Sequence, residues 1–178
     1  MSIDIVGSVE AVCMSPDHGF PTHPQDMVTI GINGIEGDAH SGIMREIFRS
    51  PGVLKPNDRP ISIVADEVRR KVNERLGIKM RAGDFNEQVL VSGLGDLGDV
   101  AIGDLVRFDT GVLLEVVDQA YPCAKLEAHN GNAKLIKALL TKDEEGNVHN
   151  KRGILTKVIT PGTLCAGVGV LILPKPAL

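Results

Sequence analysis

Cys123 is the residue of this chain best placed to do chemistry. It follows a strongly β-patterned run, Val112 to Val117, and it comes directly after Pro122, which marks the end of a strand. A thiolate at a strand end is both a nucleophile and a ligand for soft metals. The position therefore predicts a metal ligand or a sulfur carrier, and the alternative is a cysteine that packs as a small hydrophobic residue.

A carboxylate and an imidazole occur together in the segment Gly37-Asp-Ala-His40. Residues two apart in an extended segment point to the same side, so Asp38 and His40 can contact one ligand. Arg45 and Arg49 follow, and guanidinium groups with backbone amides favour an anion. The alternative is a turn with a solvated Asp38 and an incidental His40.

A second acidic turn, Gly83-Asp-Phe-Asn-Glu87, places Asp84 and Glu87 three residues apart. Both carboxylates can face a pocket, although paired acids of this kind also occur in ordinary surface turns. Phe85 between them is one of four phenylalanines in a chain without tryptophan, and we expect it in the core.

Two further histidines, His18 and His23, lie among prolines. Together with Cys13 or His40 they can form a zinc or iron site, but their loose spacing is equally that of an exposed loop. The sequence contains no Gly-x-Ser-x-Gly elbow, no phosphate-binding P-loop and no GxGxxG motif.

Composition indicates a soluble globular protein with one domain over residues 1–178. The hydrophobic fraction is 43%, the formal net charge is −4 and the pI is near 5.7, which argues against a general nucleic-acid binder. The longest apolar run, Leu164 to Leu173, is half of what a bilayer requires and predicts one buried strand. No secretory signal is visible, so we expect a cytoplasmic protein without membrane partners. Cys13 and Cys165 lie in apolar patterns and are expected to be buried.

Short β-branched runs separated by Gly, Pro, Asn and Asp predict a mainly β protein, a barrel or a sandwich rather than βαβ units. Two segments have helical periodicity instead: 66–77, which Gly77 can close, and 133–140, with Asn132 as a cap. The polar segments 51–59 and 143–150 are expected to be exposed loops. The predicted strands span residues 5–14, 27–32, 61–65, 88–91, 104–108, 112–117, 154–159 and 168–173.

The motifs, taken in order, resemble the MOSC domain, which is named for the C-terminal region of molybdenum cofactor sulfurases and is found in small stand-alone bacterial proteins. The resemblance covers residues 5–173. Three features depart from the family pattern: Gln88 follows Glu87 where asparagine is usual, Gly167-Val168 replaces a late Gly-Asp pair, and the basic residues often found in the early loop are not evident around Asp17 to His23. The matching residues are Gly34 to Gly42, Arg59 to Val64, Ala82 to Glu87, Gly93, Ile102 to Asp104, Leu114 to Val116, Cys123, Arg152 to Ile154 and Pro161-Gly162.

This resemblance implies a closed or partly closed β-barrel with two or three short helices, and binding of a molybdenum cofactor (molybdopterin). Cys123 would be the catalytic residue, as metal ligand or sulfur carrier. Its partners would be a small-molecule substrate, such as an N-hydroxylated compound, and a redox protein that delivers electrons. Alternatively, Cys123 would carry a persulfide supplied by a cysteine desulfurase, in cofactor or metal-sulfur cluster maturation. For the molybdenum cofactor, the resemblance implies that Arg59 and His40 would hold the pterin phosphate and that Asp38, Asp84 and Glu87 would hydrogen-bond the pterin ring.

Overall fold

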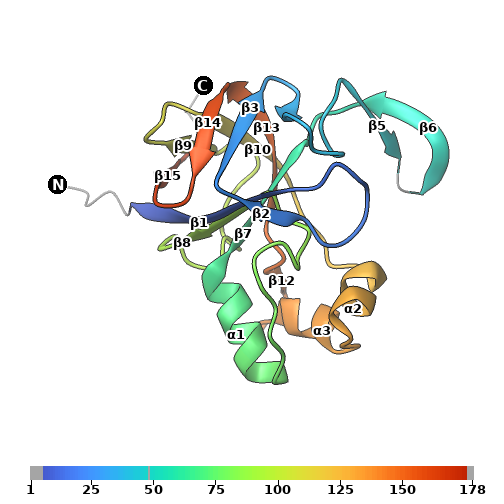
Figure 1. Cartoon of the computed structure of the whole chain (residues 1–178). Coiled ribbons are helices and arrows are strands. Elements are labelled where there is room, and N and C mark those ends of the chain that lie inside the picture. The colour runs from blue at the N-terminus through green and yellow to red at the C-terminus, as the bar shows by residue number, and fades with distance from the viewer. Residues whose placement is uncertain (1–5, 48, 176–178) are drawn as a thin grey trace.

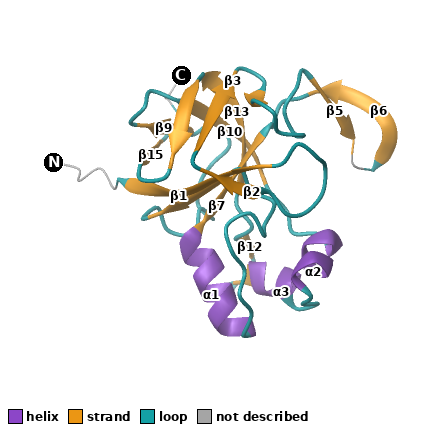
Figure 2. Cartoon of the chain, viewed as in Figure 1, coloured by secondary structure: helices purple, strands orange, loops and turns teal. Residues whose placement is uncertain are grey.

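The computed structural model describes residues 6–47 and 49–175 (Figure 1). Strands predominate, and the three helices within these ranges gather on one side of the sheet structure (Figure 2). The elements in chain order are β1 (Gly7–Met14), β2 (His23–Gln25), β3 (Met27–Gly31), β4 (Gly34–Ile35), β5 (Met44–Ile47), β6 (Ser50–Pro56), β7 (Ile61–Ala65), α1 (Asp66–Leu76), β8 (Val89–Ser92), β9 (Leu105–Phe108), β10 (Leu113–Gln119), α2 (Ala124–Asn130), α3 (Leu135–Leu139), β11 (Leu140–Lys142), β12 (Val148–Asn150), β13 (Ile154–Thr160), β14 (Gly162–Cys165) and β15 (Gly169–Leu173).

Seven strands close into a barrel in the order β15, β9, β10, β13, β7, β8, β1, because β1 also pairs with β15. β2 extends this sheet beside β1. The mainly β barrel with three helices that the resemblance implied is thereby confirmed. The barrel contains one parallel crossover, formed by β7, α1 and β8.

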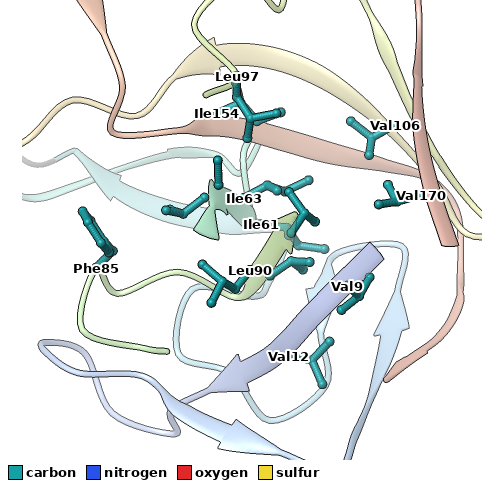
Figure 3. Packing of buried hydrophobic residues seen from close by; sticks show 14 of the residues in the cluster. Val9, Val12, Ile61, Ile63, Phe85, Leu90, Leu97, Val106, Ile154 and Val170 are labelled. Atoms are coloured by element: carbon teal, nitrogen blue, oxygen red, sulfur yellow. The ribbon is translucent and has the colours of Figure 1, made fainter. Parts of the chain in front are cut away.

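The barrel interior is filled by aliphatic side chains of the strands, among them Val9, Ile61, Ile63 and Val170 (Figure 3). β7 is buried along its whole length, as expected for a strand with a helical crossover on one face. Phe85 is fully buried but lies apart from this central group, on the loop that leads into β8 (Figure 3). The prediction of a core position for Phe85 is confirmed.

The helices extend the core beyond the barrel. α1 places Val68 and Val72 inward and ends at Gly77, whose φ of 65° is the left-handed conformation expected there. α3 is shorter than predicted and begins after Lys134 rather than Asn132. α2 was missed, because Leu126 is its one buried residue and a single apolar position gives no helical periodicity.

Three predictions on strands and loops need correction. Residues 50–56 form β6, which pairs with β5 in an exposed hairpin that projects from the barrel (Figure 1). Residues 148–150 form β12, paired with β11. The run 164–173 is divided by a turn into β14 and β15, which belong to different sheets. Cys165, at the end of β14, is partly exposed, and the prediction that it is buried was wrong. Cys13 is buried as expected.

No helix within the described ranges combines the length and apolar character that a transmembrane segment requires. Residue 5, the first of the predicted strand 5–14, lies outside the described residues.

Candidate functional site

Cys123 lies at the end of the connection between β10 and α2, where it is the N-cap residue of α2 in an extended conformation. This connection is attached to the segment before β13. The N–H of Ala120 donates to the carbonyl of Gly153 at 2.9 Å, and Asn150 Nδ2 donates to the carbonyl of Ala120 at 2.8 Å. The side chain of Cys123 packs against the core but is only partly buried. A fixed backbone therefore holds a partly buried cysteine on the connection that follows β10.

Asp38 and His40 form a carboxylate–imidazole pair in which the aspartate is buried. The Asp38 side chain is 1% exposed and that of His40 31%, with 2.9 Å between Asp38 Oδ1 and His40 Nδ1. The backbone N–H groups of Ser15 and His40 also donate to this carboxylate. Burial by itself would raise the pKa of Asp38, but the hydrogen bonds from His40 and Ser15 outweigh it and lower the pKa. Because Nδ1–H donates to Asp38, a neutral His40 ring presents Nε2 as an acceptor.

Gln88 and Asn86 surround the His40 ring. Gln88 Oε1 accepts hydrogen bonds from the N–H and hydroxyl of Ser62, and Gln88 Nε2 lies 3.2 Å from His40 Nδ1. Asn86 has a positive φ of 62°, and its Nδ2 lies 3.5 Å from His40 Nε2. Asn86 Oδ1 is buried and has no hydrogen-bond partner among the described residues. Because Nδ1–H donates to Asp38, Nδ1 cannot also accept from the Gln88 amide nitrogen, so the orientation of His40 is set by Asp38 at Nδ1 and by Asn86 at Nε2.

Glu87 organises the loop from Gly83 to Glu87. Its carboxylate has no exposed surface and accepts hydrogen bonds from the N–H of Gly83 at 2.7 Å and of Phe85 at 3.1 Å. Burial raises the pKa of Glu87, and those hydrogen bonds and the charge of Arg152 oppose the rise. A side chain at Gly83, where φ is +94°, would place its Cβ 2.0 Å from the carbonyl oxygen of Thr22. Glu87 therefore affects the site indirectly, because it fixes the conformation of the loop from Gly83 to Glu87.

Arg152 is a buried cation beside this loop. The residue is 8% exposed, its Nη2 donates to the carbonyl of Phe85, and its guanidinium carbon lies 5.6 Å from the Phe85 ring centroid. Burial lowers the pKa of Arg152, and the charges of Glu87 and Cys123 oppose that change. Nη1 is buried without a hydrogen-bond partner among the described residues. An unpaired buried donor of this kind costs about 1–3 kcal/mol, so its retention suggests a role.

Arg59 lies in the loop before β7 and is engaged by two carboxylates. Its Nη1 is 2.6 Å from Asp118 and its Nε is 3.0 Å from Asp58. The hydrogen bond to Asp58 is the main reason that the pKa of Arg59 is raised. The same loop reaches the histidine, since Asn57 Nδ2 donates to the carbonyl of His40 at 2.8 Å. A phosphate held by Arg59 would have to compete with these aspartates.

Asp84 is tied to α2, the helix that Cys123 begins. Its Oδ1 lies 2.9 Å from His129 Nε2, and Asn130 Nδ2 donates to its backbone carbonyl at 3.1 Å. The His129 ring in turn contacts Phe20, with 5.6 Å between ring centroids. Asp84 therefore couples the acidic loop to the helix that carries the thiol.

Hydrogen bonds and charge connect most of the residues selected from the sequence at one end of the barrel. Their roles toward a ligand stay predictions. Sequence reasoning gave no role to Arg152, Asn86 or Gln88, although Arg152 lies in one of the matched motifs. Asp38, His40, Arg59, Asp84, Glu87 and Cys123 all lie on loops that are joined by the contacts described above.

The alternative of a zinc or iron site built on His18 and His23 is not supported. Within the described ranges no group of three His, Cys, Asp or Glu side chains is arranged to hold a metal ion. The His18 ring instead meets the His40 ring edge-on, with 5.4 Å between centroids, and His23 is exposed on β2. Three surface cavities of about 620, 740 and 660 Å³ lie elsewhere, and Cys123 lines none of them.

The three cysteines are expected to differ in reactivity. Burial, assisted by the charge of Glu87, raises the pKa of Cys13 to about 12, so its thiol stays protonated at pH 8. Brief treatment of the native protein with iodoacetamide should therefore modify Cys123 and Cys165 and leave Cys13 intact, as read by peptide mass spectrometry. Unfolding in urea is the control and should make all three reactive. Alkylation of native Cys13 as fast as Cys165 would contradict the buried position.

A closed barrel of this topology, with a cysteine on a loop at one end, defines a class of small β-barrel domains. The family model described as "MOSC domain" matches residues 39–170, and the chain belongs to this family. Among curated proteins it is 27% identical over 125 residues to the "Putative metal-sulfur cluster biosynthesis proteins YuaD" of Bacillus subtilis (strain 168). That match spans 67% of this chain and 65% of the relative, which is less than two thirds of the relative's length.

Solved structures agree on the fold. The crystal structure of the YUAD protein from Bacillus subtilis has a TM-score of 0.81 at 24% identity, covering 97% of this chain and 98% of that chain. YiiM from Geobacillus stearothermophilus has a TM-score of 0.61 at 22% identity, covering 96% of this chain and 74% of that one. YiiM from Escherichia coli has a TM-score of 0.61 at 19% identity, covering 96% of this chain and 72% of that chain. At these identities the likeness establishes the barrel and not a shared activity.

Proposed function

We propose that this MOSC-domain protein binds a molybdenum cofactor through the thiolate of Cys123 and works as a small oxidoreductase. The single observation that carries the proposal is that the loop bearing the partly buried Cys123 is hydrogen-bonded to the segment bearing Arg152, a buried guanidinium with an N–H group that has no partner among the described residues. A thiolate suits a soft metal, and an unpaired guanidinium donor suits the oxygen of an anionic ligand. The residues present therefore fit a thiolate-ligated, anionic cofactor.

The bound cofactor would supply the electron-transfer chemistry. Cys123 would hold its metal, and the Nε2 of His40, fixed by Asp38, could accept or return a proton at the open side of the site. Asn86, whose amide nitrogen faces Nε2, would help to keep that ring in place. Arg59 and Asp84, which border the site, would contact the pterin part, while Glu87 supports the loop between them. A small substrate and an electron-donating protein complete the proposal.

Metal analysis of protein made in a host that produces molybdenum cofactor tests the first function. Wild-type protein should retain molybdenum and pterin in equal amounts, and Cys123→Ala should retain at least about tenfold less metal, because a ligand is removed. Cys165→Ala is the matched control, since Cys165 is also a partly exposed cysteine, on β14, and should load normally. Wild-type protein that binds neither molybdenum nor pterin would contradict the proposal.

A sulfur-carrier function is the second candidate, and the name of the Bacillus relative, which refers to metal-sulfur cluster biosynthesis, favours it. In this function the Cys123 thiolate would attack the outer sulfur of a persulfide on a cysteine desulfurase. Cys123 would gain that sulfur, and the desulfurase cysteine would leave as a thiolate. Cyanide-releasable sulfur on wild-type protein but not on Cys123→Ala, after incubation with a desulfurase and cysteine, is the expected result.

A further inference from the structure

A cavity of about 660 Å³ lies on the helical side of the molecule, between the end of α1 and the connection from α2 to α3 (Figure 2). α3 packs against both α1 and α2, so tertiary contacts join the elements that line this cavity. Its apolar lining consists of Leu76, Ala133 and Ala138. Small-molecule sites in proteins have volumes of about 300–1,000 Å³, and this cavity falls within that range.

All of the charged residues that line this cavity are cations, namely Arg75, Lys134 and Lys137. Lys134 is the N-cap residue of α3 and Lys137 follows three positions later, a spacing that places two side chains next to each other on a helix. Arg75 lies in the last turn of α1. Like charges at such close spacing repel each other, so an anion bound between them would relieve the repulsion.

No carboxylate pairs with these three cations within the described ranges. The ion pairs formed there include none of Arg75, Lys134 and Lys137. Glu127 of α2 does not line the cavity, and its Oε1 accepts a hydrogen bond from the N–H of Ile136 at 3.0 Å. The whole chain has a formal net charge of −4, so the positive charge of this cavity is a local feature of opposite sign.

The neighbouring cavity along α1, of about 740 Å³, has a balanced charge instead. Asp96 and Lys151 form an ion pair in its lining, with 3.3 Å between the carboxylate oxygen and Nζ. The excess of positive charge is therefore confined to the cavity beside α3 and does not extend along α1. The charged residues that line the neighbouring cavity are Glu67, Glu74 and Asp96 together with Lys71, Arg75 and Lys151.

We propose that the cavity lined by Arg75, Lys134 and Lys137 binds a small molecule with more than one anionic group, either phosphate or carboxylate. Charge-assisted hydrogen bonds from the guanidinium and the two ammonium groups would hold the oxyanions. The uncharged part of the molecule would contact Leu76 and Ala138.

This anion site is separate from the site at Cys123, and the inference does not rest on the proposed function. Cys123 is the N-cap of α2, whereas Gly131, the C-cap of the same helix, lines the cavity. The two sites thus lie at opposite ends of a helix of seven residues, which is about 10 Å long.

Pyrophosphate and citrate are the probes, and isothermal titration calorimetry of the wild-type protein at low ionic strength measures their binding. At least one of them should bind about tenfold or more tightly than acetate, because acetate can engage only one cation at a time. Tighter binding of pyrophosphate assigns the site to phosphate-bearing molecules, and tighter binding of citrate assigns it to polycarboxylates. Binding of both probes no tighter than that of acetate would overturn the inference.

Lys134→Gln/Lys137→Gln should weaken binding of the preferred probe by about tenfold, since each exposed charge interaction contributes up to about fivefold. Lys134→Arg/Lys137→Arg keeps both charges and should keep the affinity. Lys71→Gln/Lys79→Gln is the matched control, because it removes two exposed lysines on or just after α1 that do not line this cavity. An equal loss of affinity in the control would mean that the probe responds to net charge alone, which contradicts the site.

Lysine acetylation of the wild-type protein locates the probe without any substitution. The preferred probe should slow the reaction of Lys134 and Lys137 with acetic anhydride several-fold and leave that of Lys79 unchanged, as read by peptide mass spectrometry. Lys79 is an exposed lysine outside the cavity and serves as the internal reference. Equal slowing at all three lysines would show that the probe does not occupy this cavity.

Discussion

Replacement of Arg152 by methionine is expected to lower the free energy of unfolding by about 3 kcal/mol at pH 8. Methionine fills much of the same space but leaves the buried Glu87 without the charge of Arg152. It also removes the donor to the Phe85 carbonyl, which lies in the loop that Glu87 organises. Equilibrium unfolding in urea, followed by circular dichroism, measures the change.

The loss should depend on pH in a defined direction. Burial raises the pKa of Glu87, and Arg152 opposes that rise, so the variant raises it further. A carboxyl group with a raised folded-state pKa stabilises the fold fully below its unfolded pKa, near 4.5, and this contribution is lost as the pH rises through the folded-state pKa. Arg152→Met should therefore be closest to wild type near pH 5 and furthest from it near pH 8.

A double variant separates the charge interaction from the loss of packing. In Glu87→Gln/Arg152→Met both charges are absent. The loss in free energy of unfolding of the double variant should therefore be about 1–3 kcal/mol smaller than the sum of the losses of the two single variants. Lys157→Met, which breaks the exposed pair with Glu115, is the control and should cost less than about 1 kcal/mol. Additive losses in the double variant would show that Arg152 does not serve as the counter-charge of Glu87.

The barrel could be predicted because its strands carry their own pattern. The runs at 61–65 and 154–159 became β7 and β13 with nearly the same bounds, since β-branched residues and turn glycines act locally. The exposed hairpin of β5 and β6 has no apolar alternation, because no residue of β6 is fully buried. Its pairing comes from backbone hydrogen bonds, which leave no trace in composition, and from one hydrogen bond of the Gly52 N–H to the Glu46 carboxylate.

The residues of the site could be predicted only where the residue type itself indicates a chemical function. Cys123 stands out as a thiol that follows a strand-ending proline, and Asp38 and His40 stand out as a carboxylate and an imidazole in a glycine-bounded loop. Arg152 lies in the polar stretch Asn150-Lys-Arg-Gly153, which is typical of a surface turn. Its burial follows from Gly153, at φ 118°, where an added Cβ would lie 2.2 Å from the backbone oxygen of Ile63. This close approach joins two segments that are 90 residues apart, and it could not be predicted from the spacing of residues in the sequence.

Glu87 shows a second feature that residue type does not predict, which is the direction of a side chain in a loop. Two acids after a glycine suggest a pair that faces a ligand, yet only Asp84 keeps exposed surface, whereas Glu87 turns inward to satisfy backbone N–H groups of its own loop. A buried carboxylate of this kind is favourable only because the loop leaves two donors unpaired. Which of two acids takes that place depends on loop conformation, including the positive φ of Asn86.

Replacement of Asp38 by asparagine is the second change with a large expected effect, about 3 kcal/mol less stability at pH 7. The Asp38 carboxylate accepts from the N–H of Ser15, the N–H of His40 and the ring of His40. Asparagine offers a single acceptor oxygen and turns a donor toward one of these N–H groups. The His40 ring should also lose its fixed tautomer, which removes the defined acceptor at Nε2.

The pH dependence of this loss is opposite to that of Arg152→Met. Burial raises the pKa of Asp38 but the hydrogen bonds of His40 and Ser15 lower it more, so the folded-state pKa lies below 3.8. The stabilisation by Asp38 is therefore present above pH 3.8 and is lost as the pH falls through the folded-state pKa. Urea unfolding of wild type and Asp38→Asn should give curves that differ at pH 7 and converge toward pH 3.

Asp58→Asn is the matched control for that convergence. Hydrogen bonds from Arg59 hold the pKa of Asp58 at about 2, but its side chain is 48% exposed, so the variant should stay close to wild type at neutral pH. A loss in Asp38→Asn that is constant from pH 7 to pH 3 would mean that shape and not charge holds His40. In that case the imidazole would keep its orientation in the variant, and the proton-accepting role proposed for Nε2 would not depend on Asp38.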